Sequence, residues 1–87
     1  MASLVEKRTA LQKRVEAGGK ILQLEQRDLK KVAERFAEVV IFTGSEKDAR
    51  KLTPTLFEEW QAREGNVRAT DKMLEKLERK LVALDNP

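Results

Sequence analysis

The chain has 87 residues, with 18 Lys and Arg against 15 Asp and Glu, a net charge of +3, and neither cysteine nor histidine. Disulfides are therefore excluded, zinc sites are disfavoured, and the usual general bases and soft nucleophiles are missing, so we expect no enzyme activity, no catalytic or metal-binding residue, no cofactor and no small-molecule substrate. No apolar run approaches the ~20 residues of a membrane span, and we expect a cytoplasmic protein without a membrane partner.

The first predicted element is one long helix over about residues 3 to 42. Ser3 and Glu6 have the spacing of a capping box, which starts a helix. Beyond them, two rows of mostly apolar residues recur every seven positions, as at the d and a positions of a coiled coil. These rows are Leu4, Leu11, Gly18, Glu25, Val32 and Val39, and Val15, Leu22, Leu29 and Phe36. Both rows keep one phase across the adjacent Gly18 and Gly19, which favours a continuous helix over a turn.

A connection is predicted over residues 43 to 54. Gly44 is suited to the left-handed conformation that ends many helices. Ser45 begins a second capping pattern, with Asp48 three positions on, and predicts a short helix over residues 46 to 52.

A second long helix is predicted over about residues 55 to 84. Pro54 suits a first helical turn, and Thr55 with Glu58 has capping-box spacing. The heptad pattern then returns in two rows, which are Trp60, Val67, Leu74 and Leu81, and Leu56, Arg63, Thr70, Leu77 and Leu84. We interpret Trp60 as a core anchor.

Two long helices joined by a short connection pack antiparallel, so residues 1 to 87 are predicted to form one all-α domain, a coiled-coil-like helical hairpin. A lone hairpin cannot enclose a core, and it leaves residues such as Ile21, Leu24 and Met73 outside the seam between its helices. We therefore predict a homodimer in which two hairpins form a four-helix bundle. The alternative is a three-helix bundle within one chain, with a break at Gly18-Gly19.

Four residues occupy seam positions where Leu would be more stable, and they are candidates for setting register or oligomeric state: Gly18, Glu25, Arg63 and Thr70. Gly18 would let a facing Leu or a partner backbone approach closely. Glu25 and Arg63 have opposite charges, but a simple hairpin does not bring them level, so they would meet only across a dimer or in a broken-helix fold. The alternative for both charges is a solvated part of the seam.

Basic residues are candidates for contacting nucleic acid or another partner, because rows of Lys and Arg can meet phosphates without reading bases. The candidates are Lys13, Lys20, Arg27, Lys30, Lys31, Arg68, Lys72, Lys76, Arg79 and Lys80. The alternative is that they keep the helices soluble, with salt bridges such as Glu64–Arg68.

The segment KRVEAGGKI at residues 13 to 21, followed by DLKKV at residues 28 to 32, resembles the small TraD-type conjugal-transfer proteins, which pair a basic coiled-coil start with a Gly-Gly and an apolar stretch. The resemblance covers about a quarter of the chain, and residues 43 to 87 have no counterpart in it. It implies an accessory role in DNA transfer.

We expect a non-enzymatic helical interaction protein, an adaptor or regulator of the kind found on phages, plasmids and other mobile elements, which binds a protein partner. The alternative is an accessory protein that binds nucleic acid through its basic helix rows. The salt dependence of binding distinguishes these two functions, because the affinity for nucleic acid falls steeply as the salt concentration rises.

Overall fold

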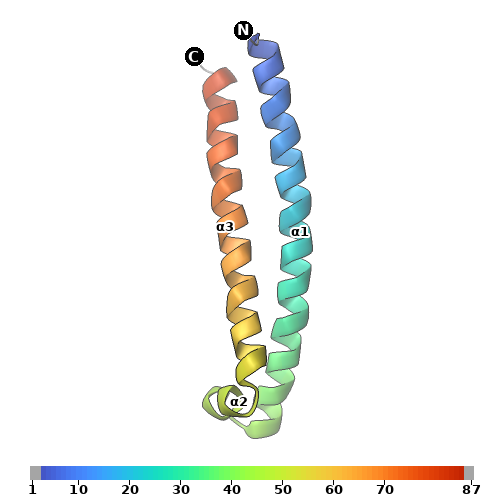
Figure 1. Ribbon diagram of the computed structural model, residues 1–87, viewed down its shortest axis with the longest axis vertical. Helices are drawn as coiled ribbons and strands as arrows, with labels where there is room; N and C mark the ends of the chain where they lie inside the picture. The colour runs from blue at the N-terminus through green and yellow to red at the C-terminus, as the bar shows by residue number, and fades with distance from the viewer. Residues whose placement is uncertain (1–2, 86–87) are drawn as a thin grey trace.

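A computed structural model describes residues 3–85 of the chain. It contains α1 (Leu4–Thr43), α2 (Glu46–Leu52) and α3 (Pro54–Asp85). The two long helices lie side by side and antiparallel, with the start of α1 and the end of α3 at one end of the molecule and α2 at the other (Figure 1). The hairpin measures 59 × 18 × 17 Å. The predicted all-α, extended hairpin is confirmed.

α1 runs without interruption from one end of the molecule to the other. At its start the hydroxyl of Ser3 accepts a hydrogen bond from the Glu6 backbone N–H at 3.1 Å. At its end Gly44 has φ 88°, and its N–H donates to the Val40 carbonyl at 2.8 Å. The helix passes through both central glycines, so the alternative fold with a break at Gly18-Gly19 is wrong.

The connection between the long helices is a short ordered helix, α2. Its N-terminus is capped by Ser45, whose hydroxyl accepts from the Asp48 N–H at 3.1 Å. Its C-terminus is closed by Thr53, whose N–H donates to the Ala49 carbonyl at 2.9 Å. α3 then begins at Pro54, so the prediction that Thr55 caps this helix is wrong: Thr55 lies inside the first turn.

The seam between α1 and α3 contains little fully buried apolar surface. Among residues 3–85 the buried hydrophobic residues are Val32, Phe36, Ala49, Leu74 and Leu77. Three aromatic rings form a cluster near α2. The centre of the Phe36 ring lies 5.6 Å from the ring centres of both Phe57 and Trp60, and those two ring centres lie 5.8 Å apart. The Arg50 guanidinium lies 4.4 Å from the centre of the Phe57 ring. This cluster, where Trp60 packs, anchors the loop end of the hairpin.

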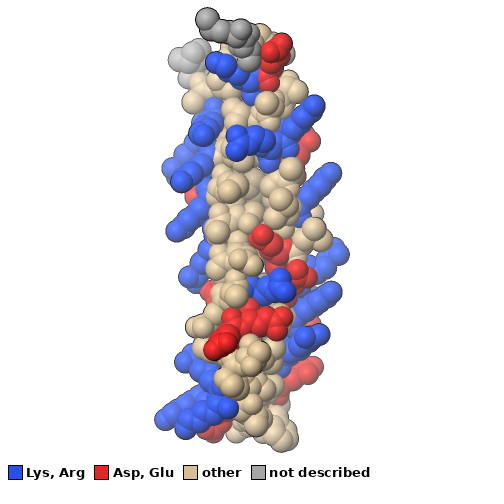
Figure 2. Space-filling model, viewed as in Figure 1, with Lys and Arg blue, Asp and Glu red and all other residues tan. Residues whose placement is uncertain are grey.

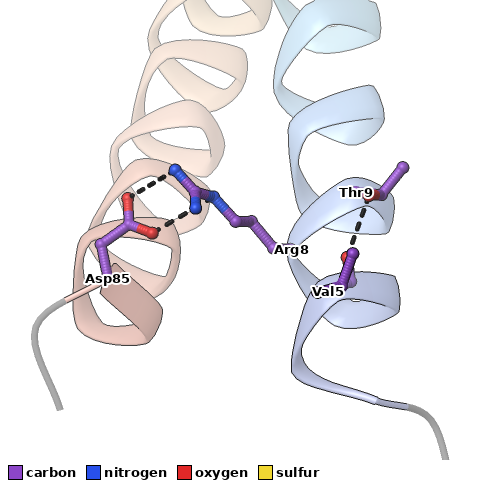
Figure 3. Close-up of polar contacts among 4 residues, drawn as sticks. All are labelled: Val5, Arg8, Thr9 and Asp85. Atoms are coloured by element: carbon purple, nitrogen blue, oxygen red, sulfur yellow. Dashed lines mark hydrogen bonds and ion pairs between the residues drawn. The ribbon is translucent and has the colours of Figure 1, made fainter.

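An ion pair joins the other end of the hairpin. The Arg8 side chain crosses from α1 to α3, where its Nε lies 3.2 Å from Asp85 Oδ1 (Figure 3). Beside it, Thr9 donates to the Val5 carbonyl within α1 at 2.9 Å. The two charged side chains remain 52% and 40% exposed, so this pair is worth less than about 1 kcal/mol.

Candidate functional site

Gly18 lies where the Leu74 side chain of α3 packs closely against the α1 backbone. A Cβ atom built on Gly18 would lie 2.6 Å from Leu74 Cδ2, whereas one on Gly19 would meet nothing within 4 Å. The buried Leu74 side chain thus packs against the α1 backbone at a position where any other residue would push it away. The facing Leu anticipated for Gly18 is Leu74 of the same chain.

Glu25 and Thr70 satisfy each other across the seam. The Thr70 hydroxyl donates to Glu25 Oε2 at 2.6 Å, and both residues are partly buried. A carboxylate acceptor makes this a charge-assisted hydrogen bond, which is stronger than a neutral one. Each of these two seam candidates therefore has its partner inside the hairpin.

Arg63 leaves the seam and reaches solvent on one side of it. Its guanidinium nitrogens lie 3.8 Å from Asp28 Oδ2 and 4.0 Å from Glu59 Oε1, and its side chain is 43% exposed. A long side chain can thus cover apolar surface with its stem while its charge stays hydrated. Arg63 and Glu25 have different partners, so in the hairpin the two seam charges do not pair with each other.

A shallow apolar groove runs between α1 and α3 on the face of the molecule that Figure 2 presents. We call this face the front face and the hollow the front groove. Figure 2 shows it as mostly uncharged surface along the middle of the half near the termini, between Lys and Arg side chains along both edges. Both helices contribute residues to it. The residues that line the groove are Lys7, Ala10, Leu11, Arg14, Ala17, Gly18, Ile21, Thr70, Met73, Leu74, Leu77, Lys80, Ala83 and Leu84.

Large apolar side chains stand open to solvent in this groove. Ile21 is 50% exposed and Met73 is 61% exposed, and Leu24, one turn beyond Ile21, is 58% exposed. The lining also includes Ala10, Ala17 and Ala83. Their side chains are short, so another chain can approach the helix backbones. The front groove is an apolar feature that both long helices build together.

Three basic residues stand in this groove: Lys7 and Arg14 from α1, and Lys80 from α3. None of the described residues that line the groove is acidic. Only Lys80 was among the candidates drawn from the sequence. Lys7 and Arg14 were missed, although they lie seven residues apart and Arg14 directly precedes the seam residue Val15, where a charge borders a helix pair.

The ten predicted binding cations are all exposed, but they do not form one surface. They are Lys13, Lys20, Arg27, Lys30, Lys31, Arg68, Lys72, Lys76, Arg79 and Lys80. Because α1 and α3 pack seam to seam, their outward rows point in opposite directions. Basic side chains accordingly project from both edges in Figure 2. Arg68 forms an ion pair with Glu64 one turn earlier, and its side chain stays 73% exposed.

Within residues 3–85, no group of three or more His, Cys, Asp or Glu side chains is placed to hold a metal ion. No helix in this part of the chain is long and apolar enough to cross a membrane.

The chain matches no protein-family model, no characterised protein and no solved structure in comparisons with each. The resemblance of residues 13 to 21 to TraD-type proteins stays a prediction from the sequence.

Proposed function

We propose that this protein is a non-enzymatic helical interaction protein that works by burying its front groove against another polypeptide. The observation that carries this proposal is the groove itself: both helices contribute to it, large apolar side chains stand open in it, and basic residues border it. Contiguous apolar surface with a polar rim is the usual anatomy of a protein–protein interface. The cytoplasmic setting and the role of adaptor or regulator on a mobile element stay part of this proposal.

Burial of the groove would supply the free energy of such an association. Each Å² of apolar surface removed from water contributes about 25 cal/mol, so covering side chains the size of Ile21 and Met73 is worth on the order of 1 to 2 kcal/mol each. The bordering cations Lys7, Arg14 and Lys80 add charge selectivity, because they favour a partner surface that brings acidic side chains to the rim.

Photo-crosslinking in expressing cells tests the proposal. A benzophenone amino acid at Met73 samples the groove, while the same amino acid at Val82 is a matched control, because both positions lie on α3 and are exposed by 61% and 58%. Val82 lies beside Glu75 and Glu78, outside the groove. We expect covalent polypeptide adducts from position 73 and few from position 82. Equal yields at both positions, or none at 73, would overturn the proposal.

The second candidate function is nucleic-acid binding, which is favoured by the basic side chains on both edges of the hairpin. Fluorescence anisotropy of a labelled duplex and a labelled single strand, at about 50 and 200 mM salt, tests it. Salt-steep binding that disappears when Arg68, Lys72 and Lys76 become Gln would support this candidate. Failure of both probes to bind at about 50 mM salt would eliminate it.

A further inference from the structure

We propose that the polypeptide in the front groove is a second copy of this chain, packed front face to front face with its α2 at the opposite end, so that α1 lies over α1 of the copy. The product is an antiparallel four-helix bundle. This inference rests on the proposed function and adds to it the identity and orientation of the occupant.

The shortage of core in a single hairpin is the first argument. Five hydrophobic residues among those described are buried, while Ile21, Leu24 and Met73 are at least half exposed although they border the seam. An 87-residue chain without cysteines needs a second source of burial, and oligomerisation is the usual one. A second hairpin on the front face would convert these side chains into the middle of a core.

The position of the exposed side chains is the second argument. Ile21 and Leu24 lie near the middle of α1, which spans Leu4–Thr43. Met73 lies within four residues of the middle of α3, which spans Pro54–Asp85, or about 5 Å along the helix axis. A two-fold axis through the middle of the front face therefore brings Ile21, Leu24 and Met73 close to the same side chains of the copy, while the part of the groove nearer the termini faces the copy's other half. Self-complementarity of this kind is what a closed dimer requires.

Charge decides the orientation of the copy. Lys7, Arg14 and Lys80 all lie in the half of the front face nearest the termini. A copy with its α2 at the same end would stack these three cations on their own counterparts. A copy with its α2 at the opposite end places them over the other half of the face, which carries the acids Asp28 and Glu59 among its basic residues. That half also carries Lys31, Arg35 and Arg63, so the antiparallel arrangement places the three cations over a mixed surface and makes fewer like-charge contacts than the same-end arrangement.

The front face is large enough to hold an interface of standard size. A face 59 Å long and 18 Å wide has a projected area on the order of 1,000 Å². Specific interfaces of standard size bury about 800 Å² on each partner. The outward rows of Lys and Arg stay at the edges of the bundle in this arrangement.

Light scattering on the purified full chain tests the identity of the occupant. From a monomer of 10.0 kDa we expect a mass of about 20 kDa at micromolar concentration. The double variant Ile21→Lys and Met73→Lys should shift this mass to that of the monomer while circular dichroism still reports helix. Val82→Lys is the matched control and should stay dimeric, because Val82 lies outside the groove. A wild-type monomer throughout the micromolar range, or a double variant that stays dimeric, would overturn the inference.

Distance measurement between spin labels tests the orientation without disturbing the groove. Glu6 is exposed in the first turn of α1, and Glu6→Cys gives a single labelling site because the chain has no other cysteine. Residue 6 lies about 26 Å from the middle of α1, so opposite orientations put the two labels about 50 Å apart. Parallel orientations would put them within about 30 Å. A short distance would overturn the antiparallel arrangement.

The two proposals fail in different ways. A monomer in solution that still gives adducts of other proteins from position 73 would remove the second copy but keep the interaction function. A monomer that gives no adducts from that position would remove both.

Discussion

The hydroxyl of Thr70 donates a hydrogen bond to Glu25 Oε2 at 2.6 Å, and this contact joins two helices across 45 residues of sequence. Both residues occupy seam positions at which an apolar side chain would pack better. The hydrogen bond offsets the cost of partly burying these two polar side chains. A seam shifted by one helical turn would leave the Glu25 carboxylate without this donor. The pair therefore favours one register of α3 on α1 over its neighbours.

Removal of the Thr70 hydroxyl should destabilise the hairpin. We expect Thr70→Val to lower the free energy of unfolding by about 1 to 2 kcal/mol, since Glu25 stays partly buried without this donor. Glu25→Leu combined with Thr70→Val should recover the loss. Urea unfolding at one fixed protein concentration measures both, and equal stability of Thr70→Val and wild type would show that the bond contributes nothing.

The two central glycines should respond oppositely to alanine. Gly19→Ala should raise the free energy of unfolding by about 0.5 to 1 kcal/mol, because Ala is the better helix former and the added methyl meets nothing within 4 Å. Gly18→Ala should lower it by about 1 kcal/mol, because its methyl would displace Leu74. The helix-propensity gain is the same at both sites, so the difference between the variants reports the contact. Two variants of equal stability would contradict the close packing at Gly18.

The aromatic cluster near α2 should dominate the stability of the loop end. Phe36→Ala should cost about 3 to 4 kcal/mol, because Phe36 is 6% exposed and lies against both other rings. Phe42→Ala is the control of the same chemistry and should stay within about 0.5 kcal/mol, because that ring is 83% exposed. Thermal unfolding followed by the fluorescence of Trp60 measures both. A large loss from Phe42→Ala would reveal that the exposed ring has a partner in solution.

The ion pair at the open end should contribute little, and only at low salt. Arg8→Gln should cost less than about 1 kcal/mol, since both charged groups are substantially exposed. The difference from wild type should vanish near 1 M salt, where screening acts over about 3 Å. Unfolding in the two salt conditions checks this, and a cost that persists at high salt would point to packing of the Arg8 stem instead.

Helix boundaries and helix continuity follow from local signals, and the sequence carries them. Ser3 and Ser45 accept the hydrogen bonds that their spacing to Glu6 and Asp48 predicts. The heptad phase carried through Gly18-Gly19 corresponds to one continuous α1. Thr55 is the exception among the predicted caps. Pro54 already adopts the helical conformation, so α3 begins one residue earlier in the sequence than predicted.

The contacts between the helices could not be derived from the same pattern. Heptad rows identify which side of each helix faces the seam, but not which residue of α3 stands level with Glu25. That register depends on the left-handed turn at Gly44 and on the rise through α2, which together set where Pro54 begins. For the same reason Lys80 could be predicted as a binding candidate from the sequence, but Lys7 and Arg14 could not. Only the packing of the two helices places all three residues in one groove.

The sequence by itself thus determined two long helices, their caps and the residues of the seam, because backbone hydrogen bonds and side-chain periodicity act over a few neighbouring residues. The tertiary structure decided that Thr70 meets Glu25, that Leu74 packs on Gly18, and that one face carries an apolar groove with a basic rim. The first two of these relationships join residues that lie 45 and 56 positions apart in the sequence. Nothing local specifies such pairs, because they depend on how the whole connection turns the chain back on itself.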